Sequence, residues 1–204
     1  MKKLFTIASV VLLSVTTYAQ SDAKKLLDEV SSKVKSQKNI SLEFTYTING
    51  KNNNGNIAIE GTKYVANFMG ITQIYDGKKT YMINPSDEEI TVSSKANKEG
   101  LTLSSVLSFY TKGYSYKMDS KKKEDGKTIQ YVKLTPTGKN SDIKEVLLGI
   151  DTANKNIYKK IDVLKNGSKN VLTIKTFKTN QAFSKNHFNF TSSKYPNYYI
   201  NHLD

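Results

Sequence analysis

Residue types that commonly carry catalysis or bind metals are scarce in this sequence of 204 residues. The two histidines, His187 and His202, lie near its C-terminal end and lack the spacing of a metal site. There is no cysteine, which excludes cysteine nucleophiles, thiolate metal sites and disulfide bonds. We therefore expect neither thiol chemistry nor a bound metal.

The densest acidic cluster is Asp87-Glu88-Glu89, and paired carboxylates can act as general acid and base. The cluster directly follows Pro85-Ser86, however, and this composition is typical of a solvated turn. The serine motif G-x-S-x-G, the P-loop and G-x-G-x-x-G are all absent from the sequence. The thirteen tyrosines suit strand edges and wet interfaces better than a redox site. The sequence thus predicts a protein that is not an enzyme and uses no cofactor.

The net charge is +13, and every one of the 31 basic residues is lysine. Bidentate recognition of bases and phosphates favours arginine, so we expect no nucleic acid partner. Most lysines alternate with apolar residues, as in Ile174-Lys175-Thr176-Phe177, which is the pattern of a solvated strand face. Contact with an anionic membrane surface or an acidic partner is the alternative use of this exterior.

The first nineteen residues have the pattern of a secretory signal peptide. Lys2-Lys3 are basic, Leu4 to Val15 form an apolar run, and Thr17-Tyr18-Ala19 provide small residues for cleavage. The run is shorter than the ~20 apolar residues that span a bilayer. We therefore expect cleavage before Gln20 and an exported, periplasmic mature chain, residues 20–204, that forms one domain. Without a cysteine after the signal, this chain would carry no lipid anchor.

A helix followed by a meander of short strands is predicted for the first half of the mature chain. Residues 22–37 place apolar side chains on one helical stripe, with Ser21 or Asp22 as the N-cap. Strands are predicted for Leu42–Ile48, Ile57–Ile59, Tyr64–Met69, Gln73–Tyr75, Thr80–Ile83 and Glu89–Val92, with a turn at Asn52-Asn53-Asn54-Gly55.

A second, short helix is predicted at Leu101 to Tyr110, where Leu103, Val106 and Leu107 recur at helical spacing. Further strands follow at Tyr114–Met118, Ile129–Leu134, Glu145–Asp151, Ile157–Leu164, Val171–Phe177 and Phe188–Phe190. The fold class that accounts for this order is α+β and mostly β. It consists of a single, strongly curved antiparallel sheet of about eleven strands, with two or three helices.

The hairpin Ile74 to Pro85 has apolar residues on both faces of its second strand, Thr80 to Ile83. A strand that covers one core should instead alternate apolar with polar residues. Either the concave wall lines an apolar cavity under the inserted helix, or helix and sheet close on a dry core. The sequence leaves both readings open.

The chain resembles the periplasmic lipoprotein carriers of the LolA family. An N-terminal amphipathic helix, a strand with Phe44-Thr45 and the hairpin Tyr75 to Pro85 follow the signal in the family's order. Val132-Lys133-Leu134-Thr135-Pro136 is similar to the family's strand that ends in Leu-Thr-Pro, and Phe188-Asn189-Phe190 to its late Phe-x-Phe strand. Order and spacing carry this resemblance over essentially the whole mature chain.

The resemblance implies an incomplete β-barrel with a helical lid. Such a protein would be a monomeric carrier that shelters the acyl chains of lipoproteins between the inner and the outer membrane. Its partners would be an inner-membrane ABC-type releasing complex and, if present, an outer-membrane acceptor. The implied site is a lid over an apolar wall; the wall residues are Phe44, Tyr46, Ile59, Tyr64, Phe68, Tyr81 and Ile83, and the lid residues are Leu103, Val106 and Leu107.

The sequence departs from the family at the end of the second strand, where members have a basic residue, often arginine followed by proline. Lys63 is the available cation here and would close the lid in its place, although a lysine cannot make the arginine fork. The family's tryptophans are also absent. The alternative functions are an exported binding protein for free lipid or another hydrophobic ligand, and a surface-associated structural protein.

Overall fold

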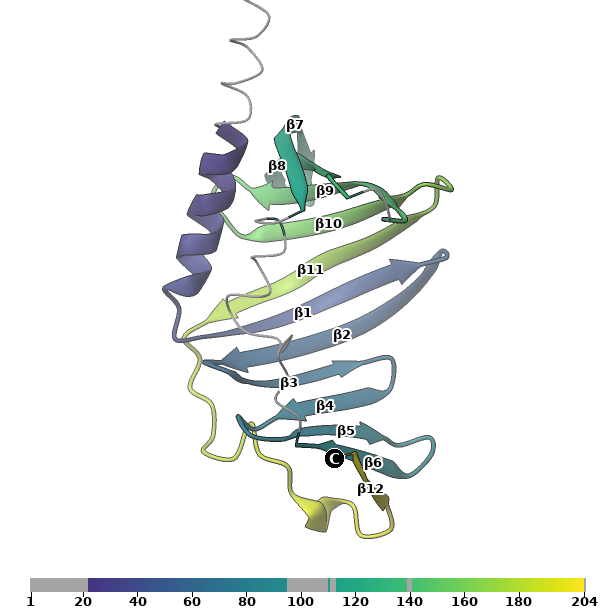
Figure 1. The fold of residues 1–204 in the computed structure, drawn as a ribbon. Coiled ribbons are helices and arrows are strands. Elements are labelled where there is room, and N and C mark those ends of the chain that lie inside the picture. Colours follow the sequence, from purple (N-terminus) through teal and green to yellow (C-terminus); the bar gives the residue numbers. More distant parts are fainter. Residues whose placement is uncertain (1–21, 95–109, 111–112, 139–140, 204) are drawn as a thin grey trace, which may run out of the picture. The chain divides into compact units, whose positions relative to one another are not determined.

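The computed structural model describes residues 22–94, 110, 113–138 and 141–203. These residues form one long helix, residues 22–35, and twelve strands (Figure 1). The strands are β1 (Asn39–Ile48), β2 (Lys51–Glu60), β3 (Lys63–Phe68), β4 (Ile71–Tyr75), β5 (Thr80–Asn84), β6 (Glu89–Ser93), β7 (Tyr114–Glu124), β8 (Lys127–Pro136), β9 (Ile143–Asp151), β10 (Ile157–Leu164), β11 (Lys169–Thr179) and β12 (Tyr199–Leu203).

The strands belong to one sheet with the order β12-β6-β5-β4-β3-β2-β1-β11-β10-β9-β8-β7. This confirms the prediction of a mostly β chain built on one extensive sheet, with twelve strands where about eleven were expected. The predicted signal peptide and, apart from Tyr110, the predicted second helix lie outside the described residues.

The chain divides into two compact units, which are described separately. Unit 1 comprises Met1–Lys33 and Tyr110–Asn170, and unit 2 comprises Val34–Phe109 and Val171–Asp204. Unit 1 therefore contains most of the N-terminal helix with β7 to β10. Unit 2 contains β1 to β6, nearly all of β11, and β12.

The helix of unit 1 makes polar contacts with Tyr110 and with the connection between β9 and β10. The Tyr110 hydroxyl donates a buried hydrogen bond to the Leu27 carbonyl at 2.8 Å. Near β9 and β10, Lys155 pairs with Glu29 at 3.2 Å, and Lys33 donates to the Asn156 side chain at 2.8 Å. The side chains that make the core of unit 1 are fully buried; they are Leu27, Val30, Val132, Leu134, Val146, Leu148 and Ile150.

Unit 2 begins with a hairpin whose turn differs from the predicted one. Asn49 (φ 49°) and Gly50 (φ 73°) form the two-residue turn between β1 and β2, because both adopt the left-handed conformation that tight hairpins need. The predicted turn at Asn52–Gly55 is wrong, since these residues are paired within β2. Side-chain hydrogen bonds from Thr45 to Asn54 (2.8 Å) and from Thr47 to Asn52 (2.7 Å) hold the asparagines in the strand.

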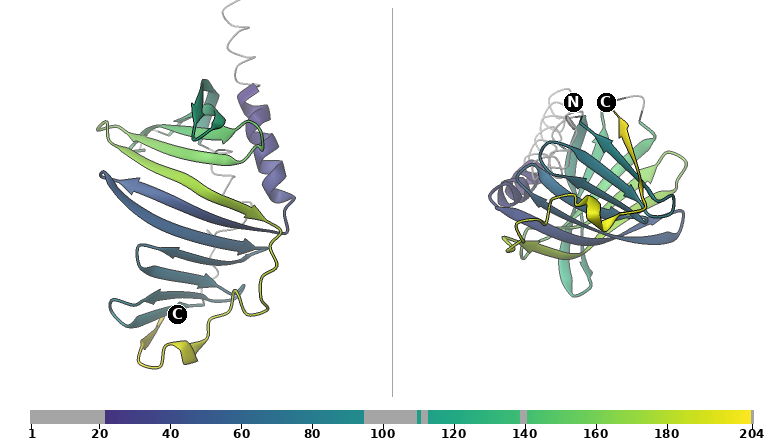
Figure 2. Two further views of the ribbon diagram at one scale, coloured as in Figure 1. Left: turned by 180° about the vertical axis from the view of Figure 1, so that it is seen from behind. Right: turned by 90° about the horizontal axis from the view of Figure 1, so that it is seen from below.

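The C-terminal part of unit 2 also differs from the prediction. Phe188–Phe190 forms no strand; Phe188 is buried instead against the rings of Phe183 and His187. The chain then runs on to β12, which joins the edge of the sheet by parallel pairing with β6 (Figure 2). All other strand pairs within unit 2 are antiparallel.

Candidate ligand-binding face

The strand register of unit 2 places five of the predicted wall residues on one face of the sheet. Phe44 is paired with Gly55, and Gly55 with Phe68, so these three residues form one row across β1, β2 and β3. Ile59 is paired with Tyr64 in a second row on the same side, since alternate residues of a strand share a face. Tyr46 lies two residues beyond Phe44 and completes what we call the apolar face.

Burial along the apolar face is graded. Ile59 and Tyr64 are fully buried, whereas the side chains of Phe44, Tyr46 and Phe68 are only half-buried. The Phe44 and Phe68 rings lie 5.7 Å apart between centroids, and the Tyr46 and Phe68 rings 5.9 Å apart. We call these three residues the aromatic wall. Part of the surface of these three rings remains accessible to solvent.

The apolar face continues onto β11, a part of the site that sequence reasoning missed. Ile174 is paired with Phe44, and Phe177 with Leu42, although the two β11 residues are three positions apart. The pairing of the two strands shifts by one residue between Glu43 and Phe44, because β11 has an extra residue there. This bulge in β11 brings Ile174 to the same face of the sheet as Phe177. Lys175 is the exposed residue within this bulge.

Tyr81 and Ile83 lie on the opposite face and are not brought together with the aromatic wall. Ile83 is paired with Thr72, which alternates with the wall-side Ile71, so it points to the other side of the sheet. There Ile83 packs with Ile74, Ile90 and Val92, and Tyr81, Phe190, Tyr195 and Tyr198 lie against this cluster. The second apolar face of the hairpin therefore contacts the chain's own C-terminal segment.

The β4–β5 turn fixes this hairpin. The Asp76 carboxylate accepts hydrogen bonds from the backbone N–H groups of Lys78 and Lys79, both at 2.8 Å, and Gly77 adopts φ 98°. The Tyr81 hydroxyl also donates to Asp76 at 3.3 Å. Burial, followed by the negative charge of Asp76, raises the pKa of Tyr81.

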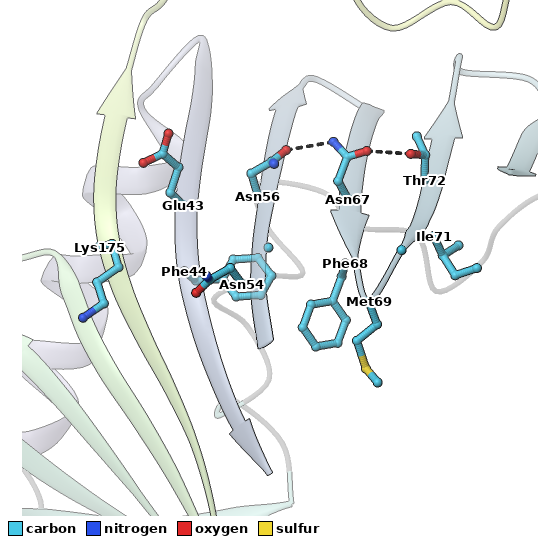
Figure 3. Close-up of a pocket in the computed structure, with 12 residues that line it drawn as sticks. Glu43, Phe44, Asn54, Asn56, Asn67, Phe68, Met69, Ile71, Thr72 and Lys175 are labelled. Atoms are coloured by element: carbon cyan, nitrogen blue, oxygen red, sulfur yellow. Dashed lines mark hydrogen bonds between the residues drawn. The ribbon is translucent and has the colours of Figure 1, made fainter. Parts of the chain in front are cut away.

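A pocket of about 520 Å³ lies over β1 to β4 and β11 of unit 2 (Figure 3). Polar residues on the face opposite the aromatic wall contribute to its lining. Asn67 donates to Asn56 at 2.9 Å, and Thr72 donates to Asn67 at 2.6 Å. The side chains of Asn56, Asn67 and Thr72 thus form hydrogen bonds with one another across β2, β3 and β4.

Lys63, the predicted lid-closing cation, begins β3 directly before the buried Tyr64. Alternation points its side chain away from the apolar face, and its aliphatic stem lies beside Gly77. The structure thus does not bring Lys63 to the aromatic wall. The predicted lid residues Leu103, Val106 and Leu107 lie outside the described residues.

Among the described residues, no group of three or more His, Cys, Asp or Glu side chains could hold a metal ion. No helix in the same part of the chain is long and apolar enough to cross a membrane. What unit 2 does present is a half-buried apolar face, and the class of protein that such a face fits best is a binding protein for apolar groups.

Comparison with known proteins agrees with this class. Residues 70–191 match the model of the family described as outer membrane lipoprotein carrier protein LolA. The match covers more than half of the chain, and the chain therefore belongs to this family of carrier proteins. None of the curated proteins compared with the chain gives a significant match.

Solved structures of two other proteins show the same fold at low sequence identity. An uncharacterized conserved protein from Thermus thermophilus is 9% identical, with a TM-score of 0.63 over 89% of this chain and 99% of that one. MucB is 13% identical, with a TM-score of 0.50 over 84% of this chain and 64% of that one. A putative outer membrane lipoprotein-sorting protein domain from Vibrio parahaemolyticus also matches; it is 14% identical, with a TM-score of 0.42 over 82% of this chain and 97% of that one.

Proposed function

We propose that this protein is a periplasmic carrier that holds the acyl chains of lipoproteins against the apolar face of unit 2. It would take them from an ABC-type releasing complex in the inner membrane and deliver them to the outer membrane. Membership of the lipoprotein carrier family supports this role.

The observation that carries the proposal is the half-buried aromatic wall of Phe44, Tyr46 and Phe68. A folded protein gains by burying such rings, at about 25 cal/mol for each Å² removed from water. An acyl chain gains about 0.8 kcal/mol per buried CH₂ group, so a long chain cannot cross water alone. Contact between the two would shield both surfaces without any catalytic group.

The test is to identify what the protein carries in its own cells. The protein is isolated from the native periplasm without detergent, and bound molecules are identified by native mass spectrometry. The proposal predicts acylated peptides in the wild type and their loss in a Phe68→Glu variant that remains folded. Free lipid alone would support the alternative function of a lipid-binding protein. A wild type that is empty and also fails to take up a purified lipoprotein contradicts both functions.

A further inference from the structure

The β7–β8 hairpin of unit 1 carries a dense group of positive charges outside the site described above. Five exposed lysines lie between positions 117 and 127, and none of them forms an ion pair with a described residue. We call this group the lysine hairpin; its members are Lys117, Lys121, Lys122, Lys123 and Lys127.

The same hairpin carries three carboxylates, Asp119, Glu124 and Asp125, and each accepts a hydrogen bond; that of Asp119 comes from the Ser120 hydroxyl at 3.1 Å. Glu124 accepts a hydrogen bond from the Tyr131 hydroxyl at 2.6 Å and also pairs with Lys159. Burial alone would raise the pKa of Glu124, but the hydrogen bonds from Lys159 and Tyr131 outweigh it and lower the pKa. Asp125 accepts a hydrogen bond from the Tyr158 hydroxyl at 2.7 Å. The five lysines therefore outnumber the three carboxylates, one of which is paired with Lys159, so the net charge of the hairpin is positive even though Asp125 is exposed.

The lysines are displayed on a fixed frame. Asp125 (φ 48°) and Gly126 (φ 74°) make a two-residue turn, and Glu124 and Lys127 close the ladder behind it. Below the turn, the fully buried Ile129 packs with Tyr131 and Tyr158. The ammonium groups of Lys122 and Lys127 lie 5.8 Å and 5.1 Å from the ring centroids of Tyr131 and Tyr158, respectively.

We propose that the lysine hairpin is a docking surface for the anionic headgroups of a membrane. Alternation places Lys121 and Lys123 on one side of the hairpin and Lys122 on the other, so an end-on approach presents both rows at once. A continuous anionic surface can neutralise charges that point in several directions, and lysine serves as a compact point charge for it. Membrane contact would bring the carrier close to the lipoproteins that it takes up or releases, and this role rests on the proposed carrier function. The binding of the lysine hairpin to anionic headgroups does not depend on that function.

The experiment measures binding to vesicles of phosphatidylcholine with and without phosphatidylglycerol, by flotation at low and at high salt. The hairpin variant combines Lys117→Gln, Lys121→Gln, Lys122→Gln and Lys123→Gln. The matched control removes the same charge from exposed positions elsewhere, by Lys165→Gln, Lys169→Gln, Lys178→Gln and Lys185→Gln. Thermal melting shows that both variants fold, and uptake of a fluorescent fatty acid is measured separately.

We expect the wild type to bind only the anionic vesicles, and to be released at high salt because salt screens exposed charges. The hairpin variant should lose about tenfold or more in vesicle binding, and the control less than about threefold. Equal losses in both variants would show that net charge alone drives binding and would overturn the proposal. Tighter binding to polyglutamate than to anionic vesicles would overturn it in favour of an acidic protein partner. Failure of fatty acid uptake with intact vesicle binding would count against the carrier function alone.

Discussion

The rings of Phe44 and Phe68 meet at 5.7 Å between centroids although the whole of β2 separates their strands. The residue between them is Gly55, which has no side chain to fill the gap. A Cβ atom built on Gly55 would lie 2.5 Å from Cζ of Phe44 and 2.9 Å from the backbone oxygen of Asn67. The glycine thus allows two aromatic rings from non-adjacent strands to form one wall.

A Gly55→Ala substitution should therefore destabilise the protein. The new methyl group would displace the Phe44 ring and press on a backbone oxygen that cannot move freely, which corresponds to about 1–3 kcal/mol of overpacking. The free energy of unfolding is measured in urea. Gly138→Ala is the matched control, because a Cβ there meets nothing within 4 Å. Equal stability of the two variants would show that the Phe44 ring is not held over Gly55.

Phe190→Ala tests the packing of the C-terminal segment. The Phe190 ring stacks on Tyr81 at 4.5 Å and on Tyr195 at 5.8 Å, so its loss should lower the free energy of unfolding by about 2–3 kcal/mol. Hydrogen exchange should become faster in β12. Tyr199→Ala, at a side chain that is 69% exposed, should change stability little. Because Phe190 packs on the face opposite the aromatic wall, a loss of fatty acid binding in the folded variant would contradict the assignment of faces.

The Asp76→Ala variant should weaken the β4–β5 turn. It removes the acceptor of two backbone hydrogen bonds, from Lys78 and Lys79, and should destabilise the protein by about 1 kcal/mol. Asp76→Asn keeps an acceptor oxygen and should restore most of this stability. The two melting curves provide the measurement, and an Asn variant no better than Ala would show that charge, not the hydrogen-bonded turn, is what matters.

Deprotonation of Tyr158 should lower the free energy of unfolding in strong base. Burial and, next, the hydrogen bond to Asp125 raise the pKa of Tyr158 from 10.0 to about 12. The folded state therefore keeps a proton that the unfolded state releases, so the stabilisation is complete below pH 10 and is lost as pH rises toward about 12. Urea unfolding between these pH values measures the slope. Tyr158→Phe should reduce it, and an unchanged slope would contradict this account.

The sequence predicted most strands because their alternation and turn residues are local features. The β4–β5 hairpin is an example, since Asp76-Gly77 marks its turn directly. The β1–β2 turn was misplaced because Asn52–Gly55 also reads as a turn, and only pairing with Thr45 and Thr47 makes these residues a strand. Local propensity was overruled there by hydrogen bonds across the hairpin.

Features that depend on distant parts of the chain were not predictable in this way. The parallel pairing of β12 with β6 joins segments that are far apart in sequence, and no local sequence pattern predicts it.

The assignment of apolar residues to the two faces of the sheet also depends on pairing between distant segments. Tyr81 and Ile83 were assigned to the wall with Phe44 because both groups are apolar, but register places them under the C-terminal segment. The register of a strand depends on its pairing with distant strands, and this pairing cannot be derived from local patterns in a single sequence.

The central claim is that acyl chains bind at the aromatic wall, and the most direct measurement compares two glutamate substitutions on opposite faces of one sheet. Phe68→Glu places a carboxylate in the wall, whereas Asn52→Glu places it at an exposed position on the polar face, outside the lining of the pocket. Binding of a fluorescent fatty acid and of a purified lipoprotein is measured for both variants, with thermal melting to confirm that they fold. We predict that Phe68→Glu loses about tenfold or more in affinity, because desolvating an unpaired carboxylate costs several kcal/mol, while Asn52→Glu binds like the wild type. Unchanged binding by a folded Phe68→Glu variant, or an equal loss in both, would contradict the claim.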